Sequence, residues 1–236
     1  MNDRRHFLKK LSLGLASPFL LHRPFSPPNE PAFIHPKVKG EDFWDEIRRA
    51  FPLTQQRVYL NNGTFGPSPT PVLEVVKHSL EQTNRTGEYG HTDEARAEIA
   101  RFVKAKASEI SLTHNTTEGI NIMVWGLPLN AGDEVILTLH EHVGNALPWL
   151  NRAKLHNIRL KTFEPADTQQ ENLDRIEALI TPKTRVIAVP HITCTTGLVL
   201  PIKEIARLAK KHGIFTAIDG AHGAGNVDLD MADLGC

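Results

Sequence analysis

Hydrophobic positions along the chain follow two different spacings. Short apolar runs such as EVIL (134–137) and RVIAVP (185–190) have the length and the branched side chains of buried strands. Between such runs lie longer stretches in which apolar residues return every three or four positions, as in helices that cover a core. The predicted strands cover residues 57–60, 109–112, 134–137, 158–162, 185–190 and 214–218. The predicted helices cover residues 41–50, 71–84, 92–107, 117–125, 143–156, 172–180 and 202–212.

The alternation of strands and helices predicts the fold class. Continuous apolar strands separated by helices indicate a mostly parallel sheet with helices on both faces, an α/β fold of three layers. Ligands bind to such sheets at the carboxyl ends of the strands. The residues directly after each strand are therefore the first candidates for chemistry.

The first forty residues differ from the rest of the chain. Residues 4–10 (RRHFLKK) and the apolar run at 11–21 resemble a twin-arginine export signal, although Asp3 stands where Ser or Thr is usual. We predict this signal over residues 1–22 and a periplasmic protein, with a basic amphipathic helix on a cytoplasmic protein as the alternative. The run is about half the ~20 residues of a membrane span, so we expect no stable span.

Proline content and charge complete the outline of the domains and partners. Five prolines predict a linker over 23–40, which leaves 41–236 as the folded domain. Lys and Arg number 27, as do Asp and Glu, so nothing favours nucleic acid or an anionic membrane as a partner. The two cysteines, Cys194 and Cys236, have no metal or redox spacing and predict no disulfide framework.

Polar residues that could bind a ligand or take part in catalysis follow two of the predicted strands. Thr116 or Thr117 is a candidate cap for the next helix, whose free N–H groups and dipole suit a phosphate. A plain helix cap is the alternative. His142 could stack on a planar ring, pair with His140 on a metal, or be structural, although no third metal ligand is evident.

A carboxylate follows the last predicted strand. Asp219 ends the apolar run at 214–218, and a buried carboxylate is costly unless it meets a cation or a strong donor. A protonated pyridinium nitrogen would be such a partner. The alternative is an aspartate that caps the next turn.

Five stretches, taken together, resemble the class V aminotransferases. This family includes cysteine desulfurases, isopenicillin-N-epimerase-like proteins and kynureninase-like enzymes. The resemblance covers residues 41–236 and implies the large domain of a fold-type I enzyme that uses pyridoxal 5'-phosphate (PLP), similar to aspartate aminotransferase. The matching stretches are VYLNNGTFGPSP (58–69), TTEGIN (116–121), EHVGNALPW (141–149), HITCTTGLVLPI (191–202) and DGAHGAG (219–225).

The resemblance implies a role for each cofactor residue. Thr116 and Thr117 correspond to residues that bind the phosphate. His142 corresponds to the imidazole that stacks on the pyridine ring, and Asp219 to the partner of the ring nitrogen, so these two are the predicted catalytic residues. His222 stands where the family has a Gln or His near the phenolic oxygen. No metal is implied.

The other implied site residues bear on the substrate. Asn61, Asn62 and Gly63 lie in the loop that shapes the substrate pocket. Cys194 falls beside the ring, where the desulfurases have an Asn, and we predict a small buried side chain there rather than a nucleophile. This departure, with the TTGLVLP stretch (195–201), favours the epimerase-like branch.

The implied function is that of a PLP-dependent enzyme that transaminates or epimerises an amino acid. The resemblance also implies a homodimer. A cysteine desulfurase or selenocysteine lyase is one alternative, and a non-catalytic remnant that acts as a binding module is another. The family's Schiff-base lysine lies further along the chain than the aspartate, and no lysine follows Lys211 here. We therefore expect an incomplete large domain, inactive by itself, of an active full-length enzyme.

Overall fold

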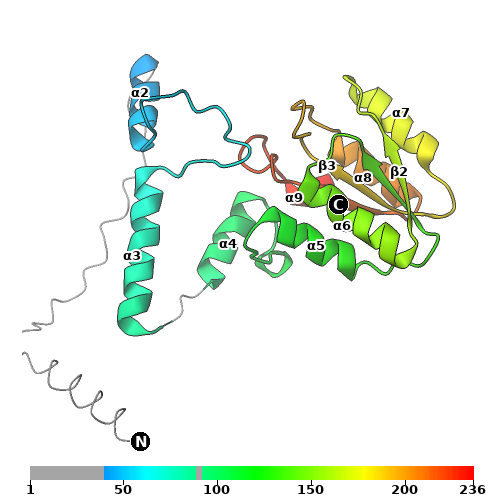
Figure 1. The fold of residues 1–236 in the computed structure, drawn as a ribbon, viewed down its shortest axis with the longest axis horizontal. Helices are drawn as coiled ribbons and strands as arrows, with labels where there is room; N and C mark the ends of the chain where they lie inside the picture. The colour runs from blue at the N-terminus through cyan, green and yellow to red at the C-terminus, as the bar shows by residue number, and fades with distance from the viewer. Residues whose placement is uncertain (1–39, 89–91) are drawn as a thin grey trace, which may run out of the picture. The chain divides into compact units, whose positions relative to one another are not determined.

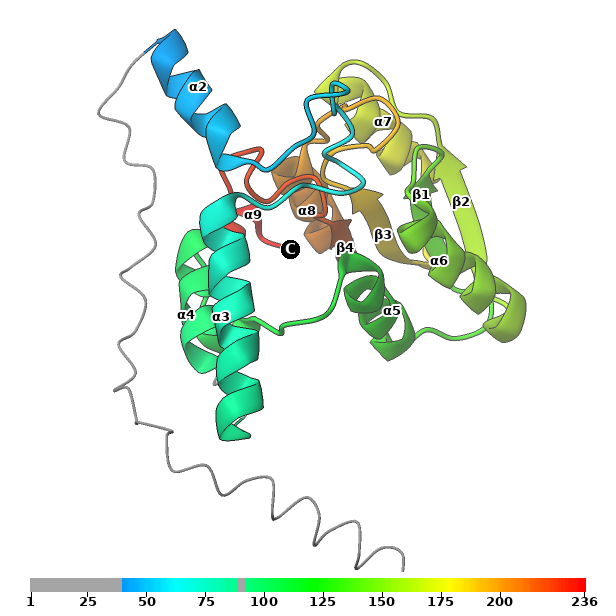
Figure 2. The same ribbon diagram turned by 60° about the vertical axis from the view of Figure 1, so that its left-hand side comes forward.

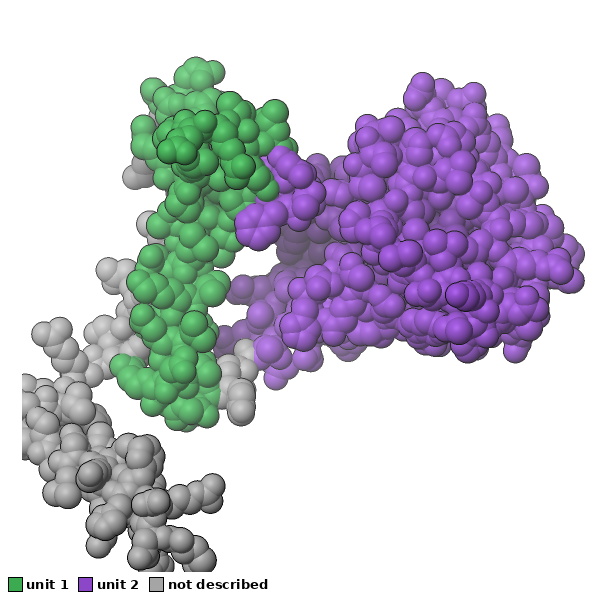
Figure 3. Space-filling model, viewed as in Figure 1, with its two compact units in different colours: residues 1–60, 67–88 green, residues 61–66, 89–236 purple. Residues whose placement is uncertain are grey.

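The computed structural model describes residues 40–88 and 92–236 (Figure 1). The predicted export signal and nearly all of the predicted linker lie outside these ranges. Two compact units divide the described chain, one with residues 40–60 and 67–88 and the other with residues 61–66 and 92–236 (Figure 3). Within the described ranges, none of the helices combines the length and apolar content that a membrane crossing requires.

The first unit contains the helices α2 (Glu41–Ala50) and α3 (Thr70–Thr86). Gly87 ends α3 in the left-handed conformation, with its N–H bonded to the Thr83 carbonyl, which is the cap that glycine favours. Neither helix has a buried residue. The apolar side chains along α3 that are more than two-fifths exposed are those of Val72, Leu73, Val75, Val76 and Leu80.

The predicted strand at 57–60 is wrong. These residues form no strand, and the side chains of Val58 and Leu60 are each 83% exposed. A strand is stable only when a neighbouring backbone pairs with it and one face is buried. The four-residue run joins no sheet in the described structure and none of its residues is buried, so its apolar content alone was misleading.

The second unit is built on a four-stranded sheet (Figure 2). Its strands are β1 (Glu134–Thr138), β2 (Arg159–Phe163), β3 (Thr184–Pro190) and β4 (Phe215–Asp219), in the spatial order β2-β1-β3-β4. Every neighbouring pair is parallel. The prediction of an α/β fold with a mostly parallel sheet is therefore confirmed.

Helices cover both faces of this sheet. Alternate residues of β1 point to opposite sides: Val135 and Leu137 join one core cluster, and Ile136 joins the other. The first cluster includes residues of α5 (Thr116–Gly126) and α6 (Val143–His156). The second includes residues of α7 (Gln169–Leu179) and α8 (Ile202–Lys211). The unit thus has the three layers that the apolar strands predicted.

The segment before the sheet departs from the prediction. The helix expected over 92–107 is shorter, as α4 (Asp93–Phe102), and it ends before Lys104, whose φ of 56° is left-handed. A 3₁₀ helix (Ala107–Glu109) replaces the start of the strand expected over 109–112, which is not formed. As at 57–60, the apolar run finds no strand to pair with. A four-residue helix, α9 (Met231–Leu234), was not predicted.

The order of the strands determines where a ligand can bind. From β1 the chain moves outward to β2, then returns to place β3 on the other side of β1, with β4 beyond it. The strand order therefore reverses between β1 and β3. A crevice at the carboxyl ends of the strands is expected at such a reversal.

Candidate functional site

A cavity of about 420 Å³ opens at the carboxyl ends of β1, β3 and β4. Its volume is in the range of cofactor sites, and all its lining residues belong to the second unit. Every predicted site residue lines it except Asn62. The predicted lining residues are Asn61, Gly63, Thr116, Thr117, His142, Cys194, Asp219 and His222, and those not predicted include Thr64, Asn115, Gly144, Ile192 and Ala221.

The start of α5 forms one side of the cavity. Asn115, not a threonine, is the N-cap, and its Oδ1 accepts the N–H of Glu118 at 2.9 Å. The sequence expectation of a threonine cap is therefore wrong. The correction strengthens the anion site, because the N–H groups of Thr116 and Thr117 donate to no described residue and remain available at the positive end of the helix dipole.

The acidic residue in the first turn of α5 is already engaged. Glu118 Oε2 accepts the His114 backbone N–H at 2.7 Å and lies 2.8 Å from the His114 ring Nδ1. These two hydrogen bonds hold the pKa of Glu118 below its usual range, so its carboxylate is occupied by the preceding loop.

His142 forms the second side of the cavity, at the N-cap of α6. Its Nδ1 accepts the Gly144 N–H at 3.0 Å, which places the proton of the neutral ring on Nε2. A Cβ atom on Gly144 would lie 2.5 Å from Thr117 Oγ1 and 3.0 Å from His142 Nδ1. Glycine at this position therefore lets the α5 start and the imidazole approach each other.

His140 does not join His142. Its Nε2 lies 2.7 Å from Glu164 Oε1, and it does not line the cavity. The described residues contain no group of three or more side chains that could hold a metal ion. His140 thus pairs with Glu164, whereas His142 lines the cavity.

Asp219 forms the third side, at the end of β4. It is only 6% exposed, its Oδ1 accepts the Ala221 N–H at 3.0 Å, and its backbone carbonyl accepts the His191 N–H. No described Lys, Arg or His forms an ion pair with it. A buried carboxylate with spare acceptor capacity and no cation is suited to a positively charged ring nitrogen.

Cys194 and Glu141 lie near this carboxylate. Loss of water around the thiol, together with the negative charges of Glu141 and Asp219, raises the pKa of Cys194. The thiol is free and exposed, so the prediction of a buried side chain at Cys194 is wrong. A raised pKa keeps it protonated, which agrees with the expectation that Cys194 is not a nucleophile.

The loop at 61–66 lies against His222. A Cβ atom on Gly63 would be 2.8 Å from His222 Cε1, so a larger residue would push the ring aside. Asn61 Oδ1 accepts the Thr64 N–H at 3.3 Å and shapes the turn. Asn62 is in the same turn but does not line the cavity. The loop predicted to form the substrate pocket thus contributes Asn61 and Gly63 to the cavity.

Asn115 and Gly144 are two of the lining residues that the sequence reasoning missed. Asn115 could have been found, because Asn is preferred over Thr at the N-cap. Gly144 had a weaker signal, a poor helix former in the first turn of a predicted helix. Its close approach to Thr117 joins segments far apart in sequence, so only the structure could show it.

Comparison with known proteins gives a consistent result. The sequence model of the aminotransferase class-V family matches residues 59–236. A probable cysteine desulfurase of Methanothermobacter thermautotrophicus is 31% identical over 201 residues, which cover 81% of this chain and 50% of that protein. The isopenicillin N epimerase of Streptomyces clavuligerus is 30% identical over 213 residues, 82% of this chain and 51% of that protein.

Solved structures show the same fold. A mutant of C-DES with glycine covalently linked to its PLP cofactor has a TM-score of 0.72 and 29% identity, over 79% of this chain and 52% of that chain. A complex of C-DES, named a cystine C–S lyase, with cysteine persulfide also has a TM-score of 0.72, at 28% identity over 78% of this chain and 52% of that chain. The present chain spans about half the length of the curated relatives it matches.

Proposed function

We propose that this chain, which belongs to the aminotransferase class-V family, holds PLP in the cavity described above and is part of an enzyme that acts on an amino acid. One observation carries the proposal: Thr117 at the start of α5, His142 at the N-cap of α6 and Asp219 at the end of β4 line a single cavity. They supply donors for an anion, a flat ring and a buried carboxylate, which are the three chemical needs of a phosphorylated pyridine.

The phosphate belongs at the start of α5. The N–H groups of Thr116 and Thr117 would donate to its oxygens, and their hydroxyls add further donors. Gly144 allows the Thr117 hydroxyl to lie close to His142, so the phosphate and ring sites adjoin.

The ring belongs between His142 and Asp219. PLP, when bound, supplies an electron sink for bonds to the α-carbon of an amino acid. Asp219 would hold a proton on the ring nitrogen, because a buried carboxylate without a cation is stabilised by that positive charge. His142 would cover one face of the ring and exclude water from it.

The cavity lacks one group that the family's chemistry uses. No lysine is among its described lining residues. The described lining thus offers groups for the phosphate, the ring and the ring nitrogen, but no amine for the cofactor's aldehyde. Turnover by the whole protein requires such an amine in addition to the residues described here.

Transamination or epimerisation is our leading proposal for the whole protein. It is supported by the likeness to an isopenicillin N epimerase and by Cys194 with the TTGLVLP stretch (195–201), which depart from the desulfurase pattern. Cysteine desulfuration is the second candidate, supported by several relatives named probable cysteine desulfurases. Incubation of the whole protein with L-cysteine separates them, because a desulfurase releases sulfur and alanine. Keto acid or the D-isomer from other amino acids supports the first proposal, and no turnover at all supports a binding module.

The cofactor proposal can be tested by comparing PLP with pyridoxal, which lacks the phosphate. Equilibrium titrations should give about 100-fold tighter binding of PLP, since two or more charge-assisted hydrogen bonds contribute about 3 kcal/mol. Thr117→Val should lower the affinity for PLP about tenfold and leave the affinity for pyridoxal unchanged. Thr162→Val, on the exposed surface of β2, is the matched control. Equal affinities for the two compounds would contradict the proposal.

Two further proposals concern the whole protein. We propose export by the twin-arginine route and assembly into a homodimer, both from the sequence. Cell fractionation with an Arg4→Lys, Arg5→Lys double variant tests export, which should fail in the variant. Light scattering of the purified protein tests the dimer, and a monomer at working concentration would exclude it.

A further inference from the structure

A half-buried carboxylate lies next to the cavity without lining it. Glu141 follows β1, directly before His142, and lies near Asp219 and Cys194. We propose that Glu141 is a positioning residue, which fixes the turn that presents the His142 imidazole to the cavity. The importance of that imidazole for the cofactor rests on the proposed function, whereas its fixed position does not.

The Glu141 carboxylate bridges the end of β1 and the start of α6. Oε1 accepts the backbone N–H of Thr138 at 3.0 Å and its hydroxyl at 2.8 Å. Oε2 accepts the side-chain amide of Asn145 at 2.7 Å. Thr138 is the last residue of β1, and Asn145 lies in the first turn of α6, so one side chain joins the two elements that flank His142.

Asn145 and Gly144 hold His142 itself. Its carbonyl accepts the N–H of Asn145 at 2.9 Å, and its ring Nδ1 accepts the N–H of Gly144 at 3.0 Å. Asn145 therefore contacts both the Glu141 carboxylate and the His142 backbone. Asn145 is 1% exposed and therefore has little freedom to move. Its contacts restrict the position of the His142 ring as well.

The surroundings of Glu141 in this turn disfavour a negative charge on its carboxyl group. Burial raises the pKa of Glu141, and the nearby charge of Asp219 raises it further, while the bonds from Asn145 and Thr138 oppose both effects. Cys194 is the third titratable group of this cluster. A neutral side chain would avoid this cost, so the carboxylate is explained by the three donors it engages together.

The buried Oδ1 of Asn145 predicts which substitution is tolerated. This oxygen has no hydrogen-bond partner among the described residues. In Glu141→Gln the new amide can donate to it after a flip of the Asn145 amide, while the Gln oxygen keeps both bonds from Thr138. Glu141→Gln should therefore preserve the turn, whereas Glu141→Ala removes its three bonds.

The test measures the turn directly, without cofactor. In the full chain, the Gly144 amide and the His142 ring nitrogens are followed by ¹⁵N NMR at pH 8, and PLP affinity is then measured by titration. Glu141→Ala should shift the Gly144 amide resonance and weaken PLP binding about tenfold, while Glu141→Gln keeps both close to wild type. The control is Glu171→Ala, which removes the carboxylate that bonds Thr168 at the start of α7. It should leave both readouts unchanged.

The outcomes separate the two proposals. If Glu141→Ala leaves the Gly144 amide and His142 ring signals unchanged, or if Glu171→Ala moves them equally, the positioning role is wrong. If the alanine variant does not fold, Thr138→Val removes one donor and should shift the same two signals less, and unchanged signals would again overturn the role. If the wild-type chain does not bind PLP, the proposed function fails, and the cofactor-free signals still decide the role of Glu141.

Discussion

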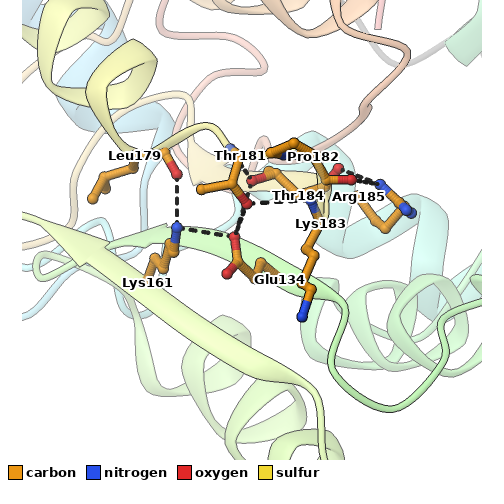
Figure 4. A network of polar contacts seen from close by, with 8 residues as sticks. All are labelled: Glu134, Lys161, Leu179, Thr181, Pro182, Lys183, Thr184 and Arg185. Atoms are coloured by element: carbon orange, nitrogen blue, oxygen red, sulfur yellow. Dashed lines mark hydrogen bonds and ion pairs between the residues drawn. The ribbon is translucent and has the colours of Figure 1, made fainter.

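Two buried carboxylates at opposite ends of the sheet have different surroundings. Glu134 begins β1 at the amino end, where its Oε2 lies 2.9 Å from Lys161 Nζ and accepts hydrogen bonds from Thr181 and Thr184 (Figure 4). Asp219 ends β4 at the carboxyl end, where the backbone N–H of Ala221 bonds its Oδ1 and no described cation pairs with it. The amino end satisfies its own charges, and the carboxyl end leaves capacity for a ligand.

The pKa directions at the two ends agree with this difference. At the amino end burial opposes the charge of Glu134, yet the bonds from Thr181 and Lys161 prevail and lower its pKa. At the carboxyl end burial and the charge of Asp219 prevail over the bonds to Glu141 and raise its pKa. Accumulated negative charge without a cation is costly in a fold that serves stability alone, and it marks a site for a positive group.

Neutralising Asp219 is the strongest test of the difference between the two ends of the sheet. Asp219→Asn keeps the acceptor for the Ala221 N–H but loses the negative charge. We expect PLP affinity to fall about 100-fold, equivalent to about 3 kcal/mol, because a charge-assisted bond is lost. The free energy of unfolding without PLP should not fall, since the charge has no described partner. Titration and chemical denaturation measure the two effects, and a loss of stability without a loss of affinity would reverse our assignment.

The converse change removes the carboxylate at the amino end. Glu134→Ala leaves Lys161, Thr181 and Thr184 without their shared acceptor. We expect the free energy of unfolding to fall by about 2–3 kcal/mol, as when one partner of a buried pair is lost. PLP affinity of the folded fraction should remain within about twofold of wild type. A large fall in that affinity would show that the two ends are not independent.

A smaller effect is expected from closing the gap between α5 and His142. Gly144→Ala places a Cβ atom 2.5 Å from Thr117 Oγ1, so the hydroxyl or the imidazole must shift. We expect about tenfold weaker PLP binding, close to 1.4 kcal/mol. Gly126→Ala is the control, because a Cβ there meets nothing within 4 Å. Equal affinities of the two variants would show that the close approach has no role in binding.

The smallest expected effect is the pH dependence of stability. Glu134 has a lowered pKa, so its contribution is present above the usual glutamate pKa of about 4.3 and is lost as the pH falls through its folded value. Glu141 has a raised pKa, so its contribution is present below that usual value and is lost as the pH rises through its folded value. Denaturation of Glu134→Gln and Glu141→Gln from pH 3 to pH 8 should give differences from wild type with opposite slopes. Slopes of the same sign would contradict the comparison.

The sequence predicted the strands of the sheet better than it predicted the segments that precede the sheet. The runs at 134–137, 185–190 and 214–218 became β1, β3 and β4, because helices bury them on both faces. The runs at 57–60 and 109–112 also contain apolar residues yet form no strand. Local composition cannot tell whether a neighbouring strand exists, and that neighbour decides the outcome.

The site followed from the same logic and has the same limit. Residues such as His142 and Asp219 could be predicted to converge, because parallel strands end at one edge. The spacing of Gly144 and Thr117, and the bridge from Glu141 to Asn145, depend on how α5 and α6 pack and could not be predicted from the sequence.

A crystal structure of the chain with PLP tests the central claim most directly. We predict the phosphate within hydrogen-bond distance of the Thr116 and Thr117 N–H groups, the ring nitrogen beside the Asp219 carboxylate, and the ring face against the His142 imidazole. PLP bound elsewhere, or in this cavity with its ring nitrogen away from Asp219, would contradict the account.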